Sequence, residues 1–390
     1  MPRMFVELCK REWKRILFDP RIATLMLIVP FIYAFLFGGE YWAGSVKQIP
    51  IVIVDQDHSR LTREITTSLA ASESLRIFTV VNSPEDFLPL VRREKAYACV
   101  VFPGHFERDV FAGKRAGVGV IVDGSNLLVG NMTSRAINTV LTTYRVGISA
   151  EELSYTGIAS SAAKTSATPV QSVVRAPFNP AFNYSYFILM GLVCVVIQQV
   201  TRMGSSIALS LDDVDDLWMN LPGPAPTVFW VYLSKIVATI ALVLPAAFIS
   251  AALPFVLFGA PFRGSALFLS IVLSLYVVMQ ISIGYGFCLF CRSSVIAVQL
   301  HLFMSVIIFI LSGFTWPVYA MPHWIRPIVY CAPLFHMNSL LRKVALNGAG
   351  PGVLLQHLLP LLVWLLVAVA SGYLAVWKQM DRTERAKFPW

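Results

Sequence analysis

The chain is 390 residues long; 56% of its residues are hydrophobic and only 14% are charged. This composition excludes an ordinary soluble protein and indicates that the lipid bilayer is the main solvent. The net charge of +9 does not require a nucleic-acid partner. Many basic residues lie beside apolar segments, where the positive-inside rule places them on the cytoplasmic side of a membrane.

Residues 1–21 predict an amphipathic helix in the membrane interface, because apolar and basic side chains recur on opposite sides at helical spacing. Trp13, Lys14 and Arg15 are its expected membrane-surface residues. Basic residues outnumber acidic ones, which places this end in the cytoplasm. Residues 22–39 follow as the first transmembrane helix. A cleaved signal peptide is the alternative, but the long charged segment before the apolar run and the lack of an A-x-A site argue against it.

Residues 40–183 are richer in charge and contain no segment apolar enough to cross a membrane, so we predict a folded domain outside the cytoplasm. Three short apolar runs, PIVIVDQD, ACVVFP and GVGVIVDG, have the length of β-strands. The segments LTREITTSLAAS and PEDFLPLVRRE and residues 131–146 are expected to be helices. The alternation of strands and helices is typical of an α/β layout.

Residues 184–377 return to the membrane. They predict five further transmembrane helices, at about 186–209, 236–258, 266–290, 295–316 and 353–377. With the first helix, these spans return the tail, residues 378–390, to the cytoplasm and place Arg202 and Lys235 at cytoplasmic flanks. The predicted fold class is a polytopic α-helical membrane protein of about six transmembrane helices with an inserted α/β extracytoplasmic domain.

The outer segment at residues 317–350 is too rich in proline for one continuous span, yet too apolar for a free loop. Short re-entrant or interfacial helices fit this composition. His323 and His336 are expected to face the interface rather than bind a metal. Cys288 and Cys291 form a C-x-x-C pair, but no second pair completes a tetrahedral site, so no metal is predicted.

The chain lacks the motifs of the common enzyme classes. It contains no GxxxxGK[ST] phosphate loop, no HExxH and no GxSxG. We therefore predict that it is not an enzyme, and that any ATP-driven work depends on a partner chain.

The connection at residues 210–227, with the sequence SLDDVDDLWMNLPGPAPT, combines acidic, apolar and helix-breaking residues. The acids are compatible with a bound cation, with a solvated surface or with the first turn of a short helix. Docking of a partner is the interpretation we favour, because an exposed tryptophan and leucine at the membrane surface form a suitable contact. The residues expected in this contact are Asp212, Asp213, Asp215, Asp216, Leu217, Trp218 and Met219.

Polar side chains inside predicted spans are costly and usually face protein or a cavity. Here they are Gln198, Gln199, Gln280, Gln299 and His301. They fit the lining of a transport path and hydrogen bonding between helices equally well. No acidic residue lies in the middle of a span, which counts against an ion-coupled carrier.

These features together resemble a family, the permease subunits of bacterial type-2 ABC transporters, in the subgroup with a large periplasmic domain after the first helix. The resemblance runs nearly end to end. It is carried by KREWKRILFDPR before the first span, by IPIVIVDQDHSRLTREITTSL, which is similar to a VVD-x-D-x-S strand-to-helix entry, and by ACVVFPGHFERDVFAGK with VIVDGSN. FNPAFNYSYFILMGLV and FTWPVYAMPHWIRPIVYCAPLFHMNSLLRKVALNG follow in the family's order.

The resemblance implies a location in the bacterial inner membrane with both termini cytoplasmic. It implies a cytosolic ABC ATPase that carries the ATP and magnesium, and a second copy of this permease or a sister permease. A periplasmic adaptor protein is a further partner that the large outer domain suggests, beside the membrane lipids. Residues 4–19 would be the membrane-surface helix and residues 212–220 the coupling helix. Relatives often have E-x-G-T-x-E-x-L in this loop, whereas this chain has DDVDDLWMNLPGP.

From the residues and the resemblance we expect the permease of an ATP-driven exporter that moves a hydrophobic or amphipathic substrate, such as a drug-like molecule or a lipid. The alternatives are a membrane receptor or scaffold of the same topology without a transport cycle, and an ion-coupled secondary carrier. The first would tolerate changes from Asp212 to Trp218 but not changes in the domain from Ile49 to Val146. The second would transport without ATP.

Overall fold

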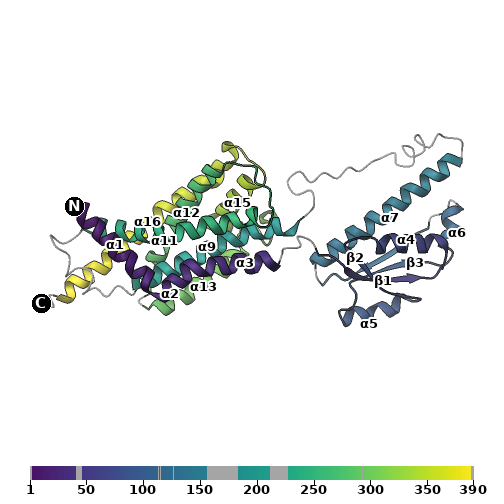
Figure 1. Ribbon diagram of the computed structural model, residues 1–390, viewed down its shortest axis with the longest axis horizontal. Helices are drawn as coiled ribbons and strands as arrows, with labels where there is room; N and C mark the ends of the chain where they lie inside the picture. Colours follow the sequence, from purple (N-terminus) through teal and green to yellow (C-terminus); the bar gives the residue numbers. More distant parts are fainter. Residues whose placement is uncertain are drawn as a thin grey trace. The chain divides into compact units, whose positions relative to one another are not determined.

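The structure, a computed structural model, describes residues 2–40, 46–112, 114, 116–125, 127–155, 183–210, 227–291 and 293–387. The chain divides into two compact units (Figure 1). One is a helical unit formed by Met1–Gly44 and Pro177–Trp390, and the other is an α/β unit formed by Ser45–Ala176. The predicted fold class, a polytopic helical protein with an inserted α/β domain, is confirmed.

The helical unit starts with a surface helix and continues with long apolar helices. The elements before the α/β unit are α1 (Pro2–Phe18), α2 (Pro20–Ala23), a π-helical turn η1 (Thr24–Ile28) and α3 (Val29–Glu40). The elements after it are α9 (Tyr184–Ser210), α11 (Val228–Val256), α12 (Ala266–Phe287), α13 (Ser294–Ile310), η3 (Val318–Ala320), α14 (Arg326–Cys331), α15 (Pro333–Ala345) and α16 (Pro351–Lys387).

The boundary between α1 and the first span is set by local chemistry. The Asp19 carboxylate accepts a hydrogen bond from the Arg21 backbone N–H at 2.9 Å and so caps α2. Pro20 occupies the first turn, where a missing N–H costs nothing. These residues end the amphipathic helix α1 and start the apolar segment.

Five of the described helices are long and apolar enough to cross a membrane: Pro20–Glu40, Tyr186–Ser210, Val228–Val256, Ala266–Phe287 and Gly352–Asp381. The sixth expected span, at 295–316, corresponds to α13, which ends at Ile310. Its 17 residues extend about 26 Å at 1.5 Å per residue, a little less than the hydrocarbon thickness of about 30 Å. The chain turns soon afterwards at Gly313, whose positive φ of 70° is incompatible with a continuing helix.

The α/β unit contains a four-stranded sheet in the order β2-β1-β3-β4. Its strands are β1 (Ile49–Asp55), β2 (Leu75–Val81), β3 (Ala98–Phe102) and β4 (Gly119–Val122). β1 is parallel to β2 and β3, and β4 is antiparallel to β3. The helices are η2 (Pro84–Asp86), α4 (Arg60–Ala70), α5 (Phe87–Arg92), α6 (Phe106–Phe111) and α7 (Leu127–Tyr155).

Three of these strands lie where the sequence predicts them, whereas β2 was not predicted. In β2, buried or half-buried side chains alternate with exposed ones, as in a strand covered on one face. The loop directly before β2 is polar. The alternation that starts at Leu75 was therefore the signal that could have predicted this strand. β2 is needed because six of the seven residues of β1 are buried, so the backbone of β1 must be hydrogen-bonded on both edges.

The run from Asp55, at the end of β1, to Ser59 builds the turn into α4. The Asp55 carboxylate accepts hydrogen bonds from the backbone N–H groups of Asp57, at 3.1 Å, and His58, at 2.9 Å. It also accepts one from the Thr62 hydroxyl at 2.8 Å, while the Ser59 hydroxyl oxygen accepts from the Thr62 N–H at 3.2 Å and caps α4. These bonds hold His58 at its positive φ of 52°.

The second aspartate of this run joins α4 to α6. The Asp57 carboxylate accepts a hydrogen bond from the Glu107 backbone N–H at 2.9 Å, and the Glu107 carboxylate accepts one from the Leu61 N–H at 3.1 Å. The Asp57 carboxylate therefore pairs with an N–H group in the first turn of α6, and the Glu107 carboxylate pairs with one in the first turn of α4. The motif VD-x-D-x-S in this chain is a structural joint for the α/β unit.

We predict that Asp55→Ala lowers the stability of the chain by about 1–3 kcal/mol, since it removes the carboxylate that accepts hydrogen bonds from the Asp57 and His58 N–H groups and the Thr62 hydroxyl. The measurement is the melting temperature of the purified full chain in detergent. Asp86→Ala removes an exposed carboxylate from the same unit and is expected to shift stability by less than about 0.5 kcal/mol. Equal melting temperatures for Asp55→Ala and wild type would show that the joint does not support the unit.

Candidate functional site

The predicted coupling residues Asp212, Asp213, Asp215, Asp216, Leu217, Trp218 and Met219 lie outside the described residues. The described chain stops at Ser210, the last residue of α9, and resumes at Thr227, just before α11. The structure shows how these two ends of the loop are held.

Helix α1 packs along α11 and is joined to it by a buried ion pair. The Lys235 ammonium donates to the Glu12 carboxylate at 2.6 Å, and both side chains are only 3% exposed. The sequence places Lys235 at a cytoplasmic flank, but the structure places it inside α11, where Glu12 neutralises it. Breaking such a pair by removing one partner leaves an uncompensated charge, which is strongly destabilising.

Two further side chains hold the last turn of α9. The Arg15 guanidinium donates to the Ala208 carbonyl, and the Gln379 amide of α16 donates to the Leu209 carbonyl at 3.1 Å. The last carbonyls of a helix lack partners within it, so these bonds satisfy groups that would otherwise be orphaned. Arg15 also lies 3.9 Å from Glu12. We call this set, with Lys235, the α1 anchor.

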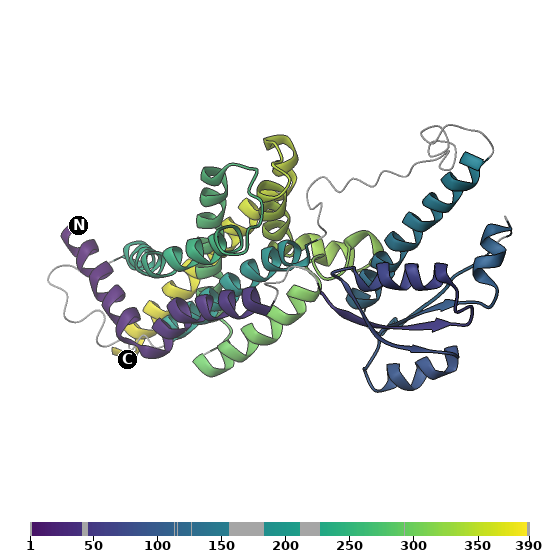
Figure 2. The same cartoon turned by 45° about the vertical axis from the view of Figure 1, so that its right-hand side comes forward.

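The α1 anchor brings four helices together at the end of α9. Figures 1 and 2 show α1 and the C-terminal part of α16 at the same end of the helical unit. Of the predicted surface residues, Trp13 and Lys14 are exposed, whereas Arg15 is half-buried because it reaches α9.

The centre of the helical unit contains three hydrogen-bonded pairs between α9 and α12, which we call the polar ladder. The Tyr276 hydroxyl donates to the Gln198 side-chain oxygen at 3.3 Å. The Arg202 Nε donates to the Gln280 side-chain oxygen at 2.5 Å. The Ser206 hydroxyl donates to the Gly284 carbonyl at 2.7 Å.

The spacing of the polar ladder follows from helix geometry. Each pair is 78 residues apart in sequence, and successive pairs are separated by four residues on both helices. A constant separation means that α9 and α12 run parallel, and four residues are about one helical turn. Successive hydrogen-bonded pairs of the polar ladder are therefore one helical turn apart.

Gly284 allows the two helices to approach each other closely. A Cβ atom at this position would lie 2.7 Å from the Arg202 carbonyl oxygen and 2.8 Å from the Ser205 Cβ. Small residues at such contacts are typical of helix pairs in membranes. The rung between Ser206 and Gly284 depends on this approach, because the short serine side chain reaches the backbone carbonyl of α12 directly.

The five predicted path residues are distributed unevenly. Gln198, Gln280 and His301 are buried within the bundle, Gln199 is half-buried and Gln299 is exposed on α13. The first two belong to the polar ladder. His301 lies 2.7 Å from the Ser206 hydroxyl, which already donates to Gly284, so the imidazole Nε2 is the donor in this contact.

The sequence did not predict several residues of the α1 anchor and the polar ladder as parts of a site. Arg202, expected at a cytoplasmic flank, is only 7% exposed and lies in the middle of the polar ladder. Glu12 and Tyr276 were not singled out. The available signal was the four-residue spacing of Gln198 and Arg202 within one apolar helix, repeated by Tyr276 and Gln280.

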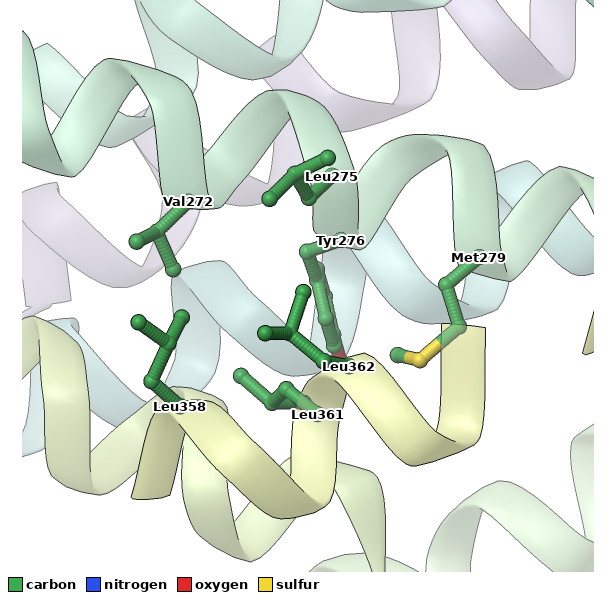
Figure 3. A pocket seen from close by; sticks show the side chains of 7 residues that line it. All are labelled: Val272, Leu275, Tyr276, Met279, Leu358, Leu361 and Leu362. Atoms are coloured by element: carbon green, nitrogen blue, oxygen red, sulfur yellow. The ribbon is translucent and has the colours of Figure 1, made fainter. Parts of the chain in front are cut away.

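A small apolar pocket lies between α12 and α16 (Figure 3). Its lining residues are Val272, Leu275, Tyr276, Met279, Leu358, Leu361 and Leu362. Its cavity volume is only about 10 Å³, which is about the space that one water molecule needs and far below the roughly 300–1,000 Å³ of a drug-sized site. It has no charged lining residue and is best described as loose packing beside Tyr276.

The outer helices hold a chain of buried hydrogen bonds. The His336 Nε2 lies 2.7 Å from the Tyr330 carbonyl, and the Nδ1 atoms of His336 and His357 lie 3.1 Å apart. The Lys343 ammonium lies 2.8 Å from the His357 Nε2. Because lysine only donates and the carbonyl only accepts, the imidazoles are neutral and the chain runs from Lys343 to Tyr330.

This arrangement corrects the expectation for His336. The sequence places it at the membrane interface, whereas it is only 4% exposed and faces His357. His323 is exposed, as expected. Burial lowers the pKa of His336, although its bond to the Tyr330 carbonyl acts in the opposite direction. Among the described residues, no group of three or more metal-ligating side chains is present.

Known proteins resemble this chain over nearly its whole length. The sequence model of the ABC-2 family transporter proteins matches residues 21–374. The chain is 22% identical to the probable multidrug ABC transporter permease YbhR of Escherichia coli K12 over 373 residues, or 94% of this chain and 96% of that protein. It is 22% identical to the probable multidrug ABC transporter permease YbhS of the same strain, over 96% of this chain and 97% of that protein. It is also 24% identical to its inner membrane transport permease YhhJ, over 87% and 88%.

We predict that Gly284→Ala destabilises the chain by about 1–3 kcal/mol, because the added methyl group pushes α12 away from α9. The melting temperature of the purified chain in detergent measures this effect. Gly147→Ala, on α7, is the matched control: no heavy atom lies within 4 Å of its added carbon, and the change is expected to be neutral or to stabilise by up to about 1 kcal/mol. A melting temperature of Gly284→Ala at or above that of wild type would contradict the close helix contact.

The His336 hydrogen bonds predict a pH-dependent stability. Because the folded pKa of His336 is below the ordinary value of 6.5, the unfolded chain binds a proton first as the pH falls. The stabilisation is therefore fully present above about pH 6.5 and decreases below it. His336→Gln should show a smaller fall in melting temperature from about pH 7.5 to about pH 5. His323→Gln should behave like wild type, and an unchanged slope in His336→Gln would exclude His336 as the source.

Proposed function

The chain belongs to the ABC-2 family of transporter proteins, and from this we propose that it is the transmembrane permease subunit of an ATP-driven exporter. The exporter moves a hydrophobic or amphipathic substrate, such as a drug-like molecule or a lipid, outward across the bacterial inner membrane. The names of YbhR and YbhS, probable multidrug permeases, support this class of cargo. In this arrangement both termini lie in the cytoplasm.

ATP hydrolysis takes place on a separate cytosolic ABC ATPase, which carries the ATP and magnesium. The loop at residues 210–227 docks into this subunit through the acidic and apolar side chains from Asp212 to Met219. The observation that carries this proposal is the α1 anchor, because it ties α1 and α16 to the last turn of α9, directly before that loop. A contact at the loop therefore acts on several helices at once.

The α1 anchor gives the ATPase a mechanical route into the membrane. A movement of the loop displaces the end of α9, and Arg15 transfers it to α1. The Glu12–Lys235 pair passes it to α11, and Gln379 passes it to α16. Buried charge-assisted bonds suit this role because they are short and costly to break.

A second permease copy, or a sister permease, completes the transport path. Gln299 supports this proposal, because it is exposed on α13, in a helix whose exposed side chains are otherwise mainly apolar. A polar amide facing lipid is unfavourable, and the facing helix of another chain would satisfy it. The α/β unit is the part proposed to meet a periplasmic adaptor, and its exposed Phe111, beside a groove between α4, α6 and α7, supports a protein contact.

The test is co-purification of the tagged chain with its ATPase in mild detergent, with ATPase activity measured on the complex. The variant carries Trp218→Ala, Asp215→Lys and Asp216→Lys. We expect at least a roughly ten-fold loss of retained ATPase, since a buried aromatic anchor contributes about 2 kcal/mol or more to an interface.

A matched control changes the same residue types elsewhere. Trp324→Ala, Glu85→Lys and Asp86→Lys alter an exposed tryptophan and two adjacent exposed acids outside the loop. This control should retain the ATPase. Equal retention by the loop variant would exclude docking through this loop, and recovery of no ATPase with the wild-type chain would refute the permease function.

A further inference from the structure

Arg202 is a buried cation whose charge is not balanced within the described part of the chain. Its side chain is 7% exposed in the middle of the polar ladder. It forms a hydrogen bond to the neutral Gln280, and no described carboxylate pairs with it. An isolated charge in a membrane bundle is expensive and is normally paired. The same bundle shows the normal solution at Lys235, which is neutralised by Glu12.

The surroundings of Arg202 contain more hydrogen-bond donors than acceptors. Gln280 and Gln198 use their side-chain oxygens to accept from Arg202 and Tyr276. Their Nε2 groups, and the Thr201 hydroxyl, are fully buried without a partner. Since arginine only donates, the orientation of the Gln280 amide is fixed by this bond. The unused groups of the site are therefore mainly N–H donors around a positive charge.

A buried polar group without a partner costs about 1–3 kcal/mol, so several of them around one cation require an explanation. Water could accept from the amides but would not neutralise the guanidinium. An anion does both, and guanidinium groups bind carboxylate and phosphate oxygens through paired N–H donors.

Arg202 lies in the C-terminal half of α9. It is eight residues before the end of α9, or about 12 Å along the helix at 1.5 Å per residue. A hydrocarbon chain attached to a head group bound there would lie among apolar helices.

We propose that Arg202, together with Gln198, Thr201 and Gln280, forms a binding site for the phosphate or carboxylate head group of an amphipathic molecule. This inference rests on the proposed export function and specifies its substrate class as an anionic amphiphile. Arg202 supplies the charge, and the amide N–H groups and the Thr201 hydroxyl complete the hydrogen bonding.

The experiment measures the melting temperature of the purified full chain, with its co-purified ATPase and without ATP, as dodecyl phosphate is added to dodecyl maltoside micelles. We expect a saturable increase, because a ligand that binds only the folded state stabilises it. The same amount of additional dodecyl maltoside, which is neutral, should give no increase. An equal increase with inorganic phosphate alone would overturn the assignment to an amphiphile.

Variants test the role of Arg202 directly. Arg202→Gln should weaken the apparent affinity for dodecyl phosphate roughly ten- to hundred-fold, the range for losing one charged hydrogen-bond partner. Arg202→Lys keeps the charge and should retain part of the response. Arg93→Gln removes the same charge from an exposed turn of the α/β unit and should respond like wild type.

Gln280→Glu gives a second test that does not depend on removing the arginine. It places a carboxylate of the same size opposite Arg202, so the melting temperature without ligand should rise and the response to dodecyl phosphate should disappear. A wild-type chain that does not respond, or equal responses in wild type, Arg202→Gln and Gln280→Glu, would overturn the site. Because the assay contains no ATP, a failure of ATP-driven export with binding intact would refute export alone.

Discussion

The parallel contact between α9 and α12 is the constraint on which the helical unit depends. It exists because Gly284 has no side chain and lets the Arg202 backbone and the Ser205 Cβ come close. At that distance, α9 and α12 can form a hydrogen bond with each other at every helical turn. The three pairs of the polar ladder form in this way. In a bilayer, where apolar packing alone does not drive helices together, such close and polar contacts hold a bundle.

The polar groups of this bundle are arranged in two different ways. The α1 anchor is closed, since Glu12 neutralises Lys235 and the last carbonyls of α9 have donors. The polar ladder is open, since Arg202 has a neutral partner and nearby amides have unused N–H groups. A network whose polar groups are paired with each other suits the transfer of movement from the loop after α9. A network with unused hydrogen-bond donors suits the binding of a ligand. Both lie along α9, which therefore links the two proposed roles.

The α/β unit shows that a motif can mark a family without marking its chemistry. The run from Asp55 to Ser59 contributed strongly to the resemblance, and the structure gives it a mechanical role in joining β1, α4 and α6. Its two aspartates accept hydrogen bonds from backbone N–H groups, a role that aspartate commonly takes in turns. The features from which we propose coupling and ligand binding lie instead in the helical unit, where single polar residues interrupt apolar helices.

Composition and apolar run length alone determined the membrane class, the inserted α/β domain, three of its four strands and the absence of the common catalytic motifs searched for, because these depend on local sequence. Local sequence also placed Arg202 and Lys235 at cytoplasmic flanks, did not predict β2 and extended α13 beyond Ile310. Only the tertiary structure showed that Lys235 meets Glu12, 223 residues away, and that Arg202 meets Gln280, 78 residues away. Whether a buried charge is balanced depends on which helices become neighbours, and that is decided by packing between distant segments.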